Sequence, residues 1–156
     1  MKMTKIVSTT ADIFYPFCLI FGFYVVAHGH LTPGGGFQGG AVIATGAALL
    51  IVARSFKDIS EKLRKNFLKV CESVGLCLFI AAGASGFFLG EPFFSNWLAH
   101  AGSIFGTPVA LGPNPGSLNT AGLLPIMNVA VGIEVFGGLS IILLYMLSGL
   151  SKEKPQ

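Results

Sequence analysis

A single acidic residue, Glu134, stands near the middle of a long apolar stretch of the sequence. It lies two or three residues from the centre of residues 125–147, about 3 Å from a bilayer midplane at about 1.5 Å per helical residue. A charge at that depth costs at least about 2.5 kcal/mol on insertion scales, so the side chain faces protein or water and is a candidate functional group. Three roles fit: a proton or cation relay, a structural hydrogen bond to a neighbouring subunit, or a neutral, protonated side chain without a part in transport.

Other side chains could extend a path from this carboxylate. Ala130 and Gly138 lie one helical turn from it and leave room for a partner side chain, a water or an ion, and Tyr145 follows on the same face. His28 and His30 could relay protons at the outer mouth because imidazole titrates near neutral pH, although both could instead cap or brace a turn. The candidate ion-path residues are therefore Glu134, His28, His30 and Tyr145.

The densest motif covers residues 29–40 and reads Gly-His-Leu-Thr-Pro-Gly-Gly-Gly-Phe-Gln-Gly-Gly. It formally contains the Gly-x-Gly-x-x-Gly pattern of dinucleotide sites, but that pattern requires a preceding strand and a βαβ unit, and apolar spans flank it here. A phosphate loop is excluded because its lysine-containing motif is missing from the sequence. We interpret the segment as a tight turn back into the membrane, redirected at Pro33 and allowed by glycines that permit close backbone approach.

Small residues recur every four positions and predict faces on which helices pack closely. The two predicted helix-packing rows are Gly36, Gly40, Ala44 and Ala48, and then Ala82, Gly86 and Gly90. Two such faces in a short chain are satisfied within the chain or suit a subunit wedged between other membrane subunits.

The helices that position these residues are predicted from the length of the apolar segments in the sequence. Of 156 residues, 53% are hydrophobic and 11% are charged, whereas about 25% of an average soluble domain is charged. Four apolar segments are long enough to cross about 30 Å of hydrocarbon, and none shows the alternation of a barrel strand. We expect a single all-α integral membrane domain with transmembrane helices near 9–28, 34–56, 67–90 and 122–147, and a long outer loop over 91–120.

Lysine and arginine are distributed asymmetrically. All 10 lie before the first span, in residues 54–69 or after the last span. By the positive-inside rule both termini are cytoplasmic and the protein is a multi-pass plasma-membrane protein in contact with lipid. We expect the first span to be kept as a helix rather than cleaved as a signal peptide. The net charge of +3 is thus a topology signal, and we expect no nucleic-acid partner.

Several polar segments have simpler interpretations. Asp12 and Glu72 are expected to anchor span ends near the membrane surface, pairing with Lys5 or Lys69. Residues 57–65 alternate in charge, as on a solvated segment or a contact with a peripheral subunit. Residues 94–105 suit either a short interfacial helix or an irregular aromatic loop packed on protein. The 3 cysteines and 3 histidines form no ligand set, so we expect no metal site and no cofactor.

The motif at residues 29–40, placed between two spans, resembles the signature of the B-type component of Mrp-type (Mnh) multisubunit Na+/H+ antiporters. The resemblance extends over essentially the whole chain through the order of spans and the charge-free outer segments. It implies a non-catalytic membrane subunit whose partners are other Mrp-type membrane subunits and through whose complex Na+, H+ or both pass. The residues that carry the motif are Gly29, His30, Pro33, Gly34, Gly35, Gly36, Phe37, Gly39 and Gly40.

The fourth span distinguishes between host complexes. Residues 124–135 lack the Asp usual at the start of this span in the B-type components of stand-alone antiporters, and are more similar to the Mrp-like B-type component of archaeal membrane-bound hydrogenases and their sulfur-reducing relatives. That resemblance implies hydrogenase-like partner subunits, in complexes where ferredoxin-driven electron transfer is coupled to ion pumping. The alternatives are a subunit of a stand-alone antiporter, a small autonomous four-helix homodimeric carrier, and a structural spacer.

Overall fold

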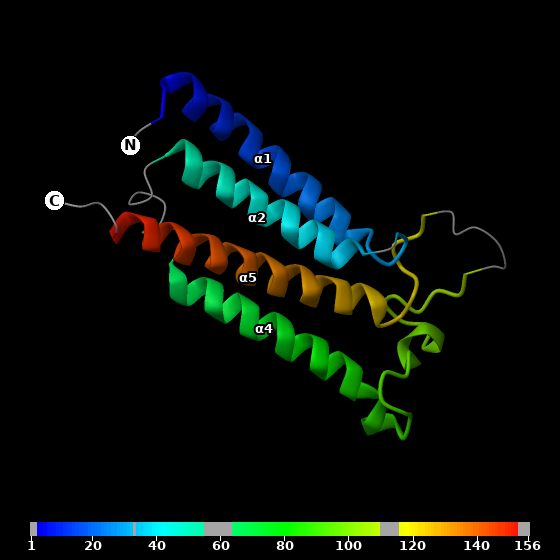
Figure 1. Ribbon diagram of the computed structural model, residues 1–156. Helices are drawn as coiled ribbons and strands as arrows, with labels where there is room; N and C mark the ends of the chain where they lie inside the picture. Colours follow the sequence, from blue (N-terminus) through cyan, green and yellow to red (C-terminus); the bar gives the residue numbers. More distant parts are fainter. Residues whose placement is uncertain (1–2, 33, 55–63, 110–115, 153–156) are drawn as a thin grey trace.

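The fold is all-helical over the residues that the computed structural model describes, which are 3–32, 34–54, 64–109 and 116–152. Four helices are long and apolar enough to cross a membrane, which confirms the predicted all-α membrane architecture. Two short 3-10 helices follow the third of them. In chain order the elements are α1 (Lys5–Ala27), α2 (Gly35–Ala53), α4 (Lys65–Ala84), η1 (Ser85–Leu89), η2 (Trp97–His100) and α5 (Leu124–Lys152), labelled as in Figure 1.

Helix ends differ from the predicted spans for local reasons. Helix α1 begins four residues early because the Thr4 hydroxyl accepts a hydrogen bond from the Val7 N–H at 3.5 Å, as an N-cap. Helix α2 ends at Ala53 because Arg54 adopts an extended backbone conformation, with φ −111° and ψ 171°. Part of the predicted charged segment, residues 57–63, and part of the outer loop, residues 110–115, lie outside the described residues.

The outer end of the third span is not the regular helix that the sequence predicted. At Ser85 the backbone tightens into the 3-10 helix η1, and Gly90 ends it with a left-handed φ of 76°. Of the two interpretations of residues 94–105, the structure favours the aromatic loop, because only the short 3-10 helix η2 forms there and Phe94 and Phe105 both have positive φ values, 61° and 63°. The Phe94 ring lies 5.9 Å from the Phe79 ring of α4, between centroids, so the aromatic loop packs on the protein.

The four long helices lie side by side in one layer, in the order α1, α2, α5, α4 (Figure 1). Helix α1 begins and α5 ends at the same end of the layer, here called the terminal end. The opposite end, the loop end, carries the turn from α1 to α2 and the loops between α4 and α5. A core of Ile51, Leu68 and Leu144 joins α2, α4 and α5 near the terminal end. Large side chains such as Phe17 (66% exposed) point outward, as expected of helices in contact with lipid or partner subunits.

Helix α2 is held between α1 and α5 through two glycine faces. On one side, a Cβ added at Gly39 would lie 2.6 Å from the carbonyl oxygen of Gly22 in α1. On the other side, a Cβ at Gly40 would lie 2.6 Å from the carbonyl oxygen of Gly132 in α5, and one at Gly36 would lie 2.7 Å from that of Asn128. Only glycine permits such backbone contact, so the glycine-rich start of α2 brings three helices together.

The second predicted packing row has a different environment within the chain. A Cβ at Gly86 would meet the carbonyl oxygen of Pro92 at 2.8 Å, which belongs to the loop that follows and not to a helix. A Cβ at Gly90 would meet nothing within 4 Å among the described residues. Packing of Ala82, Gly86 and Gly90 against another helix therefore stays a prediction about a partner subunit.

Candidate ion-path residues between α4 and α5

Two glycines fix how α4 and α5 lie against each other. A Cβ added at Gly75 of α4 would lie 2.6 Å from the backbone nitrogen of Glu134 and 2.7 Å from the carbonyl oxygen of Ala130. A Cβ added at Gly137 of α5 would lie 2.7 Å from the backbone nitrogen of Glu72. The two helices are thus in direct backbone contact at two successive levels, which leaves little freedom to slide or rotate.

This register brings Glu72 close to Glu134. The Oε1 atom of Glu72 lies 3.7 Å from the position of a Cβ at Gly138, and Cβ atoms four residues apart on a helix are about 5–6 Å apart. The Glu72 carboxylate therefore lies within about 10 Å of the Glu134 Cβ. In the described residues Glu72 forms no ion pair with Lys5 or Lys69 and lies beside Gly138, one turn along α5 from Glu134, so its role as an anchor at the membrane surface stays a prediction.

Both acids lie in segments long and apolar enough to cross a membrane, the exposed Glu72 in Lys65–Leu89 and Glu134 in Leu124–Ser148. Glu134 is half-buried and lies two residues from the centre of the apolar segment Leu124–Ser148. In the part of the chain that the structure describes, neither Glu134 nor Glu72 has an ion-pair or hydrogen-bond partner. Acidic side chains at membrane depth normally face a partner group, a water-filled cavity or an ion. The α4–α5 pair is thus the candidate site in this chain.

Tyr145 lies on the same face of α5 but far from the two acids. It is 11 residues after Glu134, which is about 16 Å along the helix axis. The Nζ atom of Lys65 lies over the Tyr145 ring, 4.7 Å from its centroid, in a cation–π contact between α4 and α5. The structure therefore places this predicted ion-path residue at the terminal end, under a cation.

His28 lies in the turn at the loop end. It caps α1, and its Nδ1 donates a hydrogen bond to the Tyr24 carbonyl oxygen at 3.0 Å, because a carbonyl can only accept. Its ring also lies 4.0 Å from the Tyr24 ring, between centroids, and its own carbonyl accepts from the Thr32 hydroxyl at 3.4 Å. These contacts favour the bracing role over a proton relay for this histidine.

His30 has a different environment in the same turn. Both of its ring nitrogens are buried, and neither has a hydrogen-bond partner among the described residues. A neighbouring position, Gly29, packs against Asn128 of α5, whose Nδ2 atom lies 2.9 Å from a Cβ position there. Asn128 precedes Glu134 by six residues, about 9 Å along the helix. The turn thus meets α5 on the loop-end side of the candidate site.

The glycine-rich motif is built around helix contacts. Gly34 is the N-cap of α2 with a φ of 79°, which favours glycine. A Cβ at Gly35 would clash with the Cα of Gly29, so these two backbones also meet directly. Phe37 is 58% exposed and points away from these contacts, while Pro33 lies outside the described residues.

Asp12 at the terminal end has a partner that the sequence interpretation did not include. Its Oδ1 atom accepts a hydrogen bond from Nη2 of Arg54 at 2.5 Å, an ion pair between α1 and the end of α2. The expected partners were Lys5 and Lys69. The pairing joins residues 42 positions apart, so it depends on how α1 and α2 pack and has no local signal in the sequence.

The described residues hold no group of three or more His, Cys, Asp or Glu side chains arranged to bind a metal ion. The three cysteines, Cys18, Cys71 and Cys77, are free thiols. What the α4–α5 site offers chemically is carboxylate oxygen, which accepts protons and binds hard cations.

Comparison with known proteins agrees with the motif. Residues 6–152 match the family described as a domain related to the MnhB subunit of Na+/H+ antiporter. The chain is 34% identical over 135 residues to the B-type component of the Na+/H+ antiporter of Bacillus subtilis, covering 86% of this chain and 90% of that protein. It is 32% identical over 98 residues to a putative antiporter component, mnhB2, of Staphylococcus aureus, covering 62% and 69% of the two chains.

The chain is also 38% identical over 121 residues to an uncharacterized protein of Methanocaldococcus jannaschii. The match covers 76% of this chain and 43% of that protein, which is less than half of that relative's length. The family match covers nearly the whole chain and confirms the Mrp/Mnh B-type resemblance seen in residues 29–40. The chain therefore belongs to the family of domains related to the MnhB subunit of Na+/H+ antiporters.

Proposed function

We propose that this chain is a non-catalytic plasma-membrane subunit of an Mrp-type cation/proton antiporter module, with both termini in the cytoplasm. We further propose that Glu134, together with Glu72, forms part of the route taken by Na+ or H+. The observation that carries this proposal is that the Glu72 carboxylate of α4 lies beside Gly138, one helical turn along α5 from Glu134, and that neither acid has a cationic partner in the described residues.

The chemistry of such a pair suits transient ion binding. Carboxylate oxygens accept protons and bind hard cations, so each of the two side chains offers a ligand for the transported ion. Half-exposure of the site leaves it open to a partner side chain or to water from a neighbouring subunit. His30 lies in the turn whose Gly29 packs on Asn128 of α5, and Tyr145 lies toward the other end of α5, so the two residues extend the proposed route toward the two membrane surfaces.

We propose a respiratory membrane-bound hydrogenase or sulfane reductase as the host complex. The support is the sequence of residues 124–135, which has no Asp at the start of α5. Purification from the native membrane tests this proposal directly. Hydrogenase-type subunits that copurify with the chain favour this host, whereas antiporter-type subunits alone favour a stand-alone Mrp antiporter.

The test of the ion-path role is transport by the assembled complex in vesicles. Glu134→Gln and Glu72→Gln keep the side-chain shape but remove the charge, and each is expected to slow Na+-dependent proton movement by about tenfold or more, equivalent to about 1.4 kcal/mol in the barrier. Glu91→Gln is the matched control, because Glu91 lies in the exposed outer loop and accepts a hydrogen bond from Ser95. Full transport by an intact Glu134→Gln complex would remove the relay role.

A second measurement separates a subunit from an autonomous carrier. The chain reconstituted alone is expected to be inactive, because a subunit contributes only part of an ion path. Transport by the isolated chain, with a dimeric mass in detergent, would instead identify a homodimeric carrier.

A further inference from the structure

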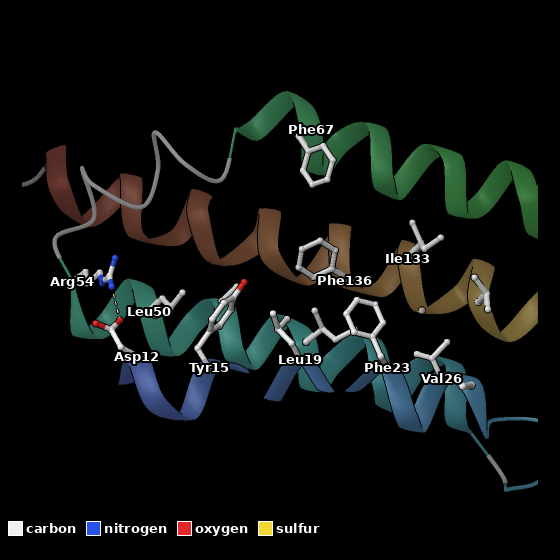
Figure 2. Close-up of a pocket in the computed structure, with 15 residues that line it drawn as sticks. Asp12, Tyr15, Leu19, Phe23, Val26, Leu50, Arg54, Phe67, Ile133 and Phe136 are labelled. Carbon is white, nitrogen blue, oxygen red and sulfur yellow. Dashed lines mark hydrogen bonds and ion pairs between the residues drawn. The ribbon is translucent and has the colours of Figure 1, made fainter. Parts of the chain in front are cut away.

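A pocket of about 1230 Å³ lies on one face of the helix layer, between α1, α2 and α5, with Phe67 of α4 also lining it (Figure 2). At the terminal end it is bounded by the Asp12–Arg54 ion pair and Tyr15. Beyond Tyr15 the wall is apolar, with Leu19 and Phe23 of α1 among the residues that point into it. The pocket therefore combines a charged mouth with a long apolar wall.

The pocket is wedge-shaped. At the loop end α1 and α5 touch, since a Cβ added at Gly132 would lie 3.0 Å from Cγ2 of Val26. Toward the terminal end the two helices diverge, which widens the space over α2 (Figure 1). From Asp12 to Val26 the wall runs 14 residues, about 21 Å along α1, which exceeds half of the roughly 30 Å hydrocarbon thickness.

We propose that this pocket binds one zwitterionic phospholipid from the leaflet at the terminal end, with a primary ammonium in its headgroup. The Arg54 guanidinium suits the phosphate, because its planar fork binds phosphate oxygens in pairs. Asp12 accepts hydrogen bonds from the ammonium. An acyl chain lies along the apolar wall past Leu19 and ends before the narrow contact of Val26 with Gly132.

Charge and shape together select this occupant. The mouth holds one cation and one anion that pair through Arg54 Nη2 and Asp12 Oδ1 and remain 36% and 42% exposed. The remaining Arg54 N–H groups and Asp12 Oδ2 match a headgroup with both charges, whereas a pair without net charge does not attract a purely anionic headgroup. A transmembrane helix is about 10–12 Å wide along its whole length, and a wedge that closes where α1 meets α5 does not accommodate it. One acyl chain is narrower than a helix, so it fits the closed end of the pocket while the headgroup lies at the open end beside Asp12 and Arg54.

The proposal is tested by counting lipids on the complex as purified, using native mass spectrometry after reconstitution into nanodiscs of phosphatidylethanolamine and phosphatidylglycerol. Leu19→Trp fills the wedge about 10 Å from the headgroup position, seven residues along α1 from Asp12. Its control is Leu78→Trp, at an exposed position of α4 that does not line the pocket. Arg54→Gln removes the phosphate ligand, and Arg64→Gln, at an exposed arginine outside the pocket, is its control.

The wild-type complex is expected to retain one more phosphatidylethanolamine than the Leu19→Trp and Arg54→Gln complexes. Leu19→Trp and Arg54→Gln are each expected to lower the affinity of the complex for phosphatidylethanolamine about tenfold or more. The control substitutions Leu78→Trp and Arg64→Gln are expected to leave this affinity unchanged. Equal retention by all variants overturns the site, and equal binding of phosphatidylglycerol overturns the headgroup assignment. A photo-crosslinker at Leu19 that captures another polypeptide or a second copy of the chain would show a protein occupant and refute the proposal. Because these measurements count bound lipid, their outcome is independent of ion transport.

Discussion

Glu134 illustrates how much a single side chain depends on what faces it. Its position near the middle of an apolar segment makes it a candidate functional residue, but a lone acid does not define a path. Gly75 and Gly137 bring α4 into backbone contact with α5 at this depth. That contact adds Glu72 to the site and converts one carboxylate into a pair.

A prediction at the residue scale compares two glycines near the acids, Gly75 in α4 and Gly138 in α5. Gly75→Ala is expected to destabilise the α4–α5 contact by about 1–3 kcal/mol, because the new methyl group would meet backbone atoms, which cannot move aside as a side chain does. Here the nearest atoms would be the Glu134 nitrogen and the Ala130 carbonyl oxygen, at 2.6 and 2.7 Å. The measurement is the midpoint of thermal unfolding of the purified complex.

Gly138→Ala supplies the matched control for this prediction. The nearest atom to its new methyl group is Oε1 of Glu72 at 3.7 Å, an ordinary van der Waals distance, so little change in the midpoint is expected. Equal effects of the two substitutions would contradict the tight register at Gly75.

At the scale of elements, α2 explains the glycine-rich motif. Gly35 and Gly39 face α1, whereas Gly36 and Gly40 face α5. Residues four apart share a helix face, and adjacent residues are turned by about 100°, so two interleaved pairs make two close-packing faces. The motif that identifies the family therefore also allows α1, α2 and α5 to pack closely against one another.

The prediction for this element is that Gly40→Ala weakens the contact of α2 with α5. Its methyl group would lie 2.6 Å from the Gly132 carbonyl oxygen and 2.9 Å from the Cβ of Val135. We expect a loss of about 1–3 kcal/mol from this overpacking, measured as a lower yield of assembled complex and a lower unfolding midpoint. Gln38→Ala, at an exposed neighbouring position of α2, is expected to leave both unchanged. Wild-type assembly of the Gly40→Ala complex would show that the contact is not tight.

For the whole molecule, the single layer of helices has a small core and two broad faces. Its buried apolar cluster, near the terminal end, is formed around Ile51, Leu68 and Leu144, while side chains such as Phe88, 91% exposed, lie on the surface. An isolated layer of this kind has too few internal contacts to bury its apolar side chains. It suits a subunit whose faces are covered by lipid and by other subunits.

The whole-molecule prediction concerns orientation in the membrane. In a chain whose native cysteines, Cys18, Cys71 and Cys77, are replaced by alanine, we expect Ser103→Cys to react with a membrane-impermeant maleimide added to intact cells. Met3→Cys is expected to react only after the membrane is permeabilised, because positively charged segments remain in the cytoplasm. Both positions are exposed in the structure. Labelling of Met3→Cys in intact cells would reverse the proposed orientation.

The sequence alone determined the properties that depend on neighbouring residues. Four apolar segments of sufficient length required four membrane helices, because a backbone in lipid has to satisfy its own hydrogen bonds. The motif at residues 29–40 carried the family, and the uninterrupted apolar context of Glu134 marked that residue. Helix ends were less well predicted, since caps such as Thr4 and the 3-10 turn at Ser85 depend on a few local hydrogen bonds.

The tertiary structure decided everything that depends on the register between helices. Glu72 joins Glu134 only because glycines in α4 and α5 allow backbone contact at one level. Asp12 pairs with Arg54, 42 positions away in the sequence, only because α1 packs against α2. The wedge between α1 and α5 exists because these helices touch at the loop end and diverge at the other. Contacts of this kind depend on how the surfaces of helices distant in the sequence fit together, so they cannot be predicted from the hydropathy of the chain.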